Sequence, residues 1–206
     1  MTSRAEAKIA VLGAMYGATT GESGRLVPRL RRVFPDAMRL VDDAAAVGER
    51  GGIVSTRLGR SSPPPGEGWL DVQGRASDAD ASEADEERAR RRGRDRGRFT
   101  RNFVVQGTAA EWALCWLAET RRRLDALPPT AAETAAPRSG RAFARRPHLA
   151  FFLHDELIVH TPDEVADDVA EIVRESARVA GRLLFGRFPV DFPLDLRIAD
   201  TAAKDA

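Results

Sequence analysis

The chain has 206 residues, of which 43% are hydrophobic, enough for one domain of ordinary size with a core of its own. Its formal net charge is +1, so charge alone predicts neither a nucleic-acid partner nor an anionic membrane surface. No apolar run approaches the roughly 20 residues of a bilayer-spanning helix, which argues against a membrane protein. The single cysteine, Cys115, cannot form an intramolecular disulfide, and the Met1 end lacks the apolar centre of a signal peptide. We therefore expect a cytoplasmic protein.

The first elements expected are helices. Residues 4–16, RAEAKIAVLGAMY, are rich in good helix formers, and Gly17 suits a helix stop. Residues 22–52 predict two further helices, separated or kinked at Pro28 and Pro35.

A glycine-flanked stretch and a charged stretch follow. Residues 51–60, GGIVSTRLGR, predict a short strand or strand pair. Residues 61–98 combine SSPPPGEG with an acidic block and then a basic block, a composition typical of a solvated, partly disordered insertion. An alternative, resting on charge alone, is that the basic half, residues 88–98, contacts a phosphate backbone.

The strongest helical pattern lies over residues 102–127. Its apolar positions include Ala109, Trp112, Leu114, Trp116, Leu117 and Leu124. We expect a long buried helix there, followed by a flexible linker over residues 128–147.

The last part predicts a hairpin, a helix and a strand. Strands are expected at 148–153 and 157–161, and both runs are so apolar that burial on both faces is expected. Pro162 then opens an amphipathic helix, and residues 188–200 alternate as a closing strand. The expected fold class is α+β, a small antiparallel sheet with helices on one face.

The hairpin tip carries the first candidate chemistry, His154, Asp155 and Glu156. Adjacent strand residues point to opposite faces, but a tight turn can direct both carboxylates to one open end. Carboxylate oxygens without a nearby cysteine suit Mg²⁺ or Mn²⁺. The alternative is ordinary turn chemistry, in which Asp is common.

The first helix carries a second candidate. Arg4, Lys8, Leu12 and Tyr16 are spaced by four, which turns each residue only about 40° from the last on the helix surface. Two cations and an aromatic ring on one stripe fit a polyphosphate and a base. The alternative is a solvated basic patch with a tyrosine in the core.

A third candidate is the pair Asn102 and Gln106, whose amides can hydrogen-bond a base edge or a sugar. Helix capping by Asn102 is the alternative.

Taken in order, these stretches resemble the C-terminal half of a family A DNA polymerase, the DNA polymerase I family. RAEAKIAVLGAMYG resembles its fingers helix, with Arg, three residues, Lys, then seven residues to Tyr-Gly. NFVVQGTAAE resembles the segment leading into the long palm helix, and FLHDELIV resembles the palm hairpin. The particular residues in these motifs are most similar to those of polymerases from high-GC Gram-positive bacteria, which combine a 3'-5' exonuclease-like domain with the polymerase.

The resemblance assigns nucleotide-binding roles to the first helix. It implies that Arg4 and Lys8 bind the triphosphate of the incoming dNTP, that Tyr16 lies at the base of the insertion site, and that Gly17 lets the helix swing. Leu12 replaces the usual aromatic residue beside the nucleotide, which leaves sugar discrimination uncertain.

It assigns DNA contacts and a metal to the rest of the chain. Asn102 and Gln106 would contact primer-template, with Arg98 close by. The turn would supply catalytic residues, His154 beside the primer terminus, Asp155 as ligand of a catalytic Mg²⁺ (or Mn²⁺), and Glu156 in support.

One motif of the family is missing. Its other metal-binding aspartate lies in a strand of the type Asp-Tyr-Ser-x-x-Glu-Leu-Arg, and nothing in this sequence matches it. The resemblance thus implies a fragment: fingers helices and a short strand region (1–60), an insertion (61–98), the long palm helix (99–127), a linker (128–147), and the palm hairpin, helix and strand (148–206).

The expected function is therefore template-directed DNA synthesis in replication and repair by the complete protein, the isolated chain being inactive. Expected partners are primer-template DNA and dNTP, with the chain monomeric and associated with the nucleoid. The alternative functions are a catalytically inactive remnant that binds DNA or nucleotide, and a metal-dependent hydrolase built on the hairpin.

Overall fold

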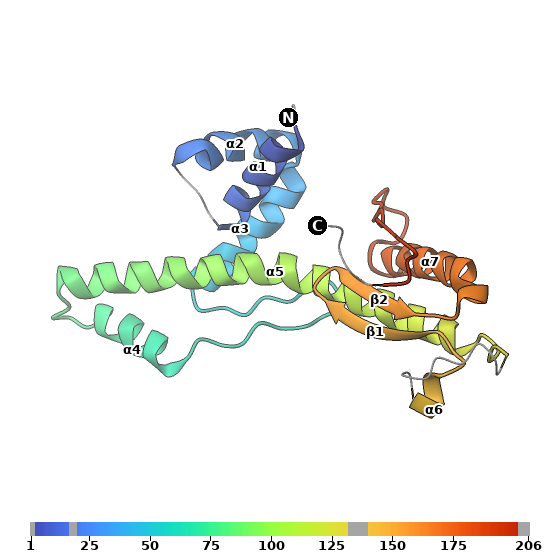
Figure 1. Ribbon diagram of the computed structural model, residues 1–206. Helices are drawn as coiled ribbons and strands as arrows, with labels where there is room; N and C mark the ends of the chain where they lie inside the picture. Colours follow the sequence, from blue (N-terminus) through green and yellow to red (C-terminus); the bar gives the residue numbers. More distant parts are fainter. Residues whose placement is uncertain (1–2, 17–19, 132–139, 202–206) are drawn as a thin grey trace. The chain divides into compact units, whose positions relative to one another are not determined.

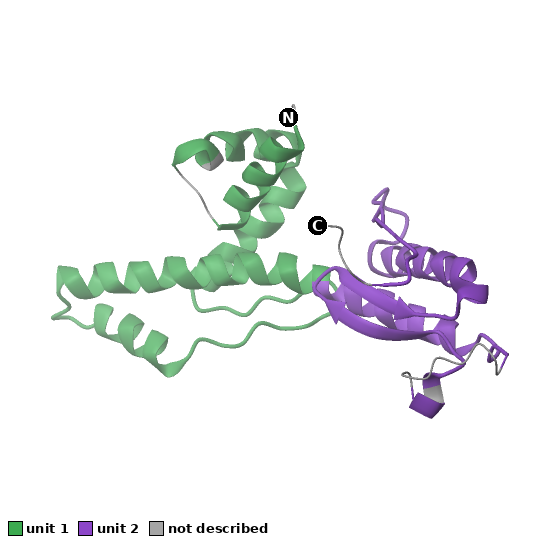
Figure 2. Cartoon of the chain, in the orientation of Figure 1, with its two compact units in different colours: residues 1–109 green, residues 110–206 purple. Residues whose placement is uncertain are grey.

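The computed structural model describes residues 3–16, 20–131 and 140–201. It has an α+β fold in which helices predominate and the sheet is a single antiparallel hairpin (Figure 1). The chain divides into two compact units, residues 1–109 and 110–206 (Figure 2), and the helix α5 contributes to both. Within the described ranges, no helix combines the length and the apolar character needed to cross a bilayer.

Three helices open the first unit. They are α1 (Arg4–Tyr16), α2 (Gly21–Val33) and α3 (Pro35–Glu49). The prediction for 4–16 is confirmed. Pro35 begins α3, where its missing N–H costs nothing, whereas Pro28 lies inside α2 and does not end it. A small core joins the three helices, made of Ala10, Ala14, Val27, Leu30 and Met38.

A shared carboxylate links these helices to α5 (Glu83–Asp125). Asp42 of α3 accepts a hydrogen bond from Arg31 of α2 at 3.0 Å and one from Arg101 of α5 at 2.6 Å. Arg101 also donates to the carbonyl oxygen of Ala14 at 2.9 Å. One acid and two arginines thus connect α1, α2, α3 and α5.

The segment after α3 is a tight turn with a single antiparallel bridge, Ser55 with Ser61, where a strand or strand pair was predicted. Ser62 donates from its backbone N–H to the carbonyl of Val54 at 2.8 Å, and Gly59, with φ of 93°, completes the turn. Val54 packs beside Val104 of α5 in a second small core.

Residues 61–98 are largely helical, so the prediction of a partly disordered insertion is wrong for most of this stretch. It contains α4 (Glu67–Ala76) and the beginning of α5. Ser82 and Asp85 cap α5 reciprocally: the Asp85 N–H donates to Ser82 Oγ and the Ser82 N–H donates to the Asp85 carboxylate. The Ser82 hydroxyl also donates to the Asp85 carboxylate, and this bond, together with the one from the Ser82 N–H, holds the pKa of Asp85 below its usual range.

The acidic block preceding the basic block then stabilises this helix, because acids and arginines pair one or two turns apart. Arg90 pairs with Glu86 at 3.1 Å and with Glu87 at 3.0 Å, and Arg94 also pairs with Glu87 at 3.0 Å. α4 is held against it by Gln73, which donates to the carbonyl of Ala89 at 3.0 Å.

The second unit contains the hairpin of β1 (His148–Leu153) and β2 (Glu156–His160), preceded by the short helix α6 (Gly140–Phe143). β1 has the predicted bounds, and β2 begins one residue earlier than predicted. The register pairs Leu153 with Glu156 and His148 with His160, with an irregularity between Leu149 and Phe151. Many strand residues are exposed, so the prediction of burial on both faces is wrong.

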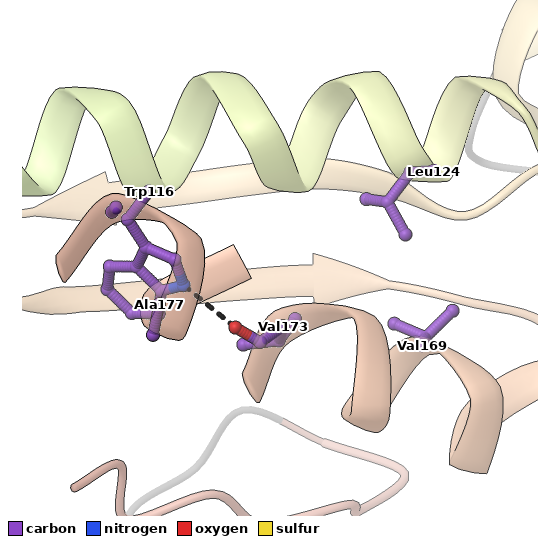
Figure 3. Close-up of a cluster of buried hydrophobic side chains, with 6 residues drawn as sticks. Trp116, Leu124, Val169, Val173 and Ala177 are labelled. Carbon is purple, nitrogen blue, oxygen red and sulfur yellow. Dashed lines mark hydrogen bonds between the residues drawn. The ribbon is translucent and has the colours of Figure 1, made fainter. Parts of the chain in front are cut away.

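One face of the hairpin packs against a core that holds this unit together (Figure 3). The core combines the end of α5 with α7 (Ala166–Phe185), which follows a short 3₁₀ helix, Asp163–Val165. Its buried residues are Trp116, Leu124, Val169, Val173, Ala177 and Ala180. Leu157 and Val159 of β2 are partly buried beside it.

No strand forms after α7 within the described residues, so the predicted closing strand is wrong. Gly186 ends α7 with φ of 61° and donates to the carbonyl of Arg182. Residues 188–199 then run without strand pairing, and their two prolines lack the N–H that a ladder needs. The alternation of apolar residues instead directs Leu194 and Leu196 to the core.

Candidate functional site

The stripe predicted on α1 is solvent-exposed along its whole length. Arg4 and Lys8 are exposed, Leu12 is 42% exposed and Tyr16 is 56% exposed. Tyr16 is therefore not a core residue, so that part of the alternative is wrong, whereas the exposed cations agree with a solvated basic patch as well as with a ligand site. The stripe faces outward because the helix packs through its small residues, Ala10 and Ala14 among them. Two cations and an aromatic ring stay available to a ligand on this surface.

Gly17, predicted as the point about which α1 swings, lies outside the described residues.

The DNA-contacting residues predicted on α5 follow one another at intervals of four. Arg98 and Gln106 are exposed, and Asn102 between them is partly buried. Because α5 begins at Glu83, Asn102 lies in the helix interior, so the capping alternative is wrong. Its Oδ1 atom is buried and accepts no hydrogen bond from the described part of the chain. Arg98 pairs with Asp95.

The hairpin turn holds the predicted catalytic residues at its tip. His154 and Asp155 form the two-residue turn between Leu153 and Glu156. The φ of His154 is 56°, and it is the only non-glycine residue with positive φ in the described structure. A positive φ at the first turn residue is typical of the primed hairpin turns, and His adopts it more readily than most residues.

All three residues of the turn motif, His154, Asp155 and Glu156, are exposed. Two adjacent carboxylates fit Mg²⁺, because proteins hold this ion with one or two carboxylates together with substrate phosphates. Within the described residues, no group of three or more His, Cys, Asp or Glu side chains is placed to hold a metal ion. The turn therefore supplies part of a coordination sphere, and phosphate oxygens or further residues would have to complete it.

The predicted site residues fall into the two units. The stripe of α1 and the residues of α5 lie in the unit of residues 1–109, and the carboxylate turn lies in the unit of residues 110–206.

The sequence interpretation missed a cavity in the first unit. Its volume is about 390 Å³, and four arginines line it: Arg31, Arg94, Arg98 and Arg101. The spacing of 94, 98 and 101 on one helix was the available signal, since these positions share one side of a helix. Arg31 comes from α2, and no local pattern connects it with the other three.

A scan against models of known protein families finds no match to this sequence, and a search among curated proteins finds none either.

Proposed function

We propose that the chain forms part of a template-directed DNA polymerase of family A, which transfers a nucleotide from a dNTP to the 3'-hydroxyl of a primer during replication and repair. The observation that supports this most is the exposed stripe of α1. Arg4 and Lys8 stand free of the core on the same side of the helix as Tyr16. This order of chemistry suits a nucleoside triphosphate, with charge for the phosphates and a ring for the base.

In this proposal the α1 stripe binds the dNTP, and Arg98, Asn102 and Gln106 contact primer-template DNA. The primer 3'-oxygen attacks the α-phosphorus, a new P–O bond forms, and pyrophosphate leaves. Mg²⁺ supplies charge neutralisation to the phosphates when bound. Asp155 would hold it with support from Glu156, and His154 would lie beside the primer terminus.

A two-metal reaction also needs a carboxylate from outside the turn. The proposal therefore assigns activity to a complete protein that contains the missing aspartate motif, and it predicts that the 206 residues alone extend primers poorly or not at all.

The test is Mg²⁺-dependent primer extension by protein expressed from the complete reading frame in which the sequence lies. Asp155→Asn is expected to abolish extension. Asp163→Asn, which changes an exposed acid of the neighbouring 3₁₀ helix, is expected to leave it unchanged. Full extension by the Asp155→Asn variant would contradict the metal-binding role.

The alternative is a remnant that binds DNA or nucleotide without catalysis. It is favoured by the placement of the exposed catalytic acids on a single turn, which offers one side of a two-metal site. A remnant would bind primer-template with an affinity that Asp155→Ala barely alters, and it would not extend the primer even when expressed from the complete frame.

A further inference from the structure

We infer that the arginine-lined cavity of the first unit is an anion site that takes a phosphate or diphosphate group, free or carried by a nucleotide. The cavity, of about 390 Å³, is lined by residues of α1, α2, α3 and α5. The α1 residue that lines it is the buried Gly13, and none of the four stripe residues takes part. The cavity is thus separate from the proposed dNTP site, and it shares only Arg98 with the residues proposed to contact primer-template DNA.

Helix geometry explains why three of the four arginines line the same cavity. Arg94, Arg98 and Arg101 follow at steps of four and three, so they lie within about 60° of one another around α5. Arg31 joins them from α2. Planar guanidinium groups from two elements suit a phosphate, whose several oxygens accept paired N–H bonds.

Most of the N–H donors of these arginines are not used within the described structure. A guanidinium group has five such donors. Arg31 donates one hydrogen bond, to Asp42, and Arg94 donates one, to Glu87. Arg98 donates one, to Asp95, and Arg101 donates two, of which one goes to a carbonyl oxygen. Each therefore retains donors for a ligand.

The surrounding acids neutralise the arginines only in part. Asp42 is shared between Arg31 and Arg101, which leaves one positive charge over in that group. Arg90 and Arg94 are balanced by Glu86 and Glu87, and Arg98 is balanced by Asp95. This excess favours an anion in the cavity.

One acid lines the cavity and opposes an anion, Glu49 at the end of α3. It lies close to α5 because position 97 is a glycine: a Cβ there would be 2.6 Å from the Cγ atom of Glu49. Replacing Glu49 by a neutral residue should strengthen anion binding, because it removes the opposing negative charge and leaves the arginines in place.

The experiment titrates the folded 206-residue chain with sodium pyrophosphate in an isothermal calorimeter. We expect saturable binding at one site. The double variant Arg31→Gln with Arg94→Gln should weaken it by at least about tenfold, the loss expected from one charge-assisted hydrogen bond. Glu49→Gln should tighten it by about threefold or more, since a like charge is removed. A parallel titration with a nucleoside diphosphate identifies the source, since tighter binding than pyrophosphate indicates a nucleotide and equal binding a free anion.

The matched control is Arg91→Gln, which removes the same charge from an exposed position of α5 outside the cavity lining. It should change affinity by less than about twofold, since long-range charge effects are screened by salt. Circular dichroism verifies that each variant is folded. Absence of saturable binding, an equal loss in the control, or binding of a single-stranded oligonucleotide without any binding of pyrophosphate would each overturn the inference. The outcome of this experiment does not depend on the proposed polymerase activity, because no primer is extended in it.

Discussion

The indole nitrogen of Trp116 donates a hydrogen bond to the carbonyl oxygen of Val173 over 3.0 Å. Both residues belong to the core of the second unit, Trp116 being 3% exposed and Val173 5%. The bond joins α5 directly to the middle of α7 (Figure 3).

Replacing Trp116 by Phe removes this donor and part of the buried ring. We expect the free energy of unfolding to fall by about 1–3 kcal/mol, from the lost hydrogen bond and the space left by the smaller side chain. Urea unfolding followed by circular dichroism measures the change.

Trp112 provides the control for this substitution. It stacks on Trp116 with ring centroids 5.3 Å apart, and its own Nε1 is buried with no hydrogen-bond partner in the described residues. Trp112→Phe removes an unpaired polar atom, so we expect a change of less than about 1 kcal/mol. Equal losses in the two variants would show that the bond from Trp116 to Val173 contributes nothing.

A second prediction concerns the close approach of α3 to α5 at Gly48. A Cβ atom there would be 2.0 Å from Oγ1 of Thr100 and 2.9 Å from the carbonyl oxygen of Arg96. Thr100 is fully buried and donates to the carbonyl of Ala44 at 2.7 Å, so it cannot move without losing that bond. We expect Gly48→Ala to destabilise the chain by about 1–3 kcal/mol.

Thermal unfolding of Gly48→Ala measures this, with Gly74→Ala as its control. Position 74 of α4 has open space around it, so alanine there should raise stability by up to about 1 kcal/mol through its better helix propensity. A neutral Gly48→Ala would mean that α3 and α5 separate more easily than the packing indicates.

The third prediction is a pH dependence at Glu119. Hydrogen bonds from Arg122 and Arg123 lower the pKa of Glu119 from 4.5 to about 2. Since the pKa is lowered in the folded chain, this contribution to stability is complete above the unfolded value and is lost as the pH falls toward the folded value. Glu119→Gln should therefore cost about 1 kcal/mol near neutral pH, the charges being partly screened by water.

The difference between wild type and Glu119→Gln should shrink as the pH falls from about 4.5 to about 2, where the carboxyl becomes protonated. Urea unfolding at a series of pH values measures it. Asp195→Asn, at an exposed acid of the same unit, should show no such convergence. A difference that stays constant over this range would show that the ion pairs are not its cause.

The fourth prediction tests the triphosphate role of Lys8. In protein from the complete reading frame, Lys8→Ala should raise the KM for dNTP by about tenfold, because one charge-assisted contact to phosphate is lost. Affinity for primer-template should change by less than about twofold. Arg32→Ala removes an exposed cation of α2 instead and should alter neither. Equal losses in dNTP use and DNA affinity would contradict a role specific to the nucleotide.

The sequence predicted well those elements whose signals are local. The bounds of α1 and β1 agree with prediction, because helix-forming residues in one case and an apolar run beside a turn in the other suffice to define them. The α1 stripe and the turn carboxylates are exposed, and their roles stay predictions.

The sequence predicted poorly those elements whose structure depends on pairing with other residues of the chain. Residues 188–199 alternate like a strand, yet no strand pairs with them in the described residues, and Phe192 instead stacks on Trp112 with centroids 4.4 Å apart. The first turns of α5 looked disordered by composition, because composition ignores which acid meets which arginine. The register of Glu86 and Glu87 against Arg90 and Arg94 carried that information.

For a related reason, the sequence could not predict that arginines from two different helices line one cavity. Arg31 and Arg94 line one cavity only after α2 and α5 have packed in one unit, and the sequence does not specify that packing locally.

The hairpin packs against the core of the second unit through one face only, and this arrangement determines how easily its backbone hydrogen bonds open. Leu157 and Val159 face the core, whereas Phe151, Leu153 and Ile158 remain 45%, 53% and 37% exposed. A two-stranded sheet is marginal by itself, so its protection from hydrogen exchange depends on those few inward contacts. The amides of β1 and β2 should exchange by local opening well before those of α7, which lies at the centre of the same core.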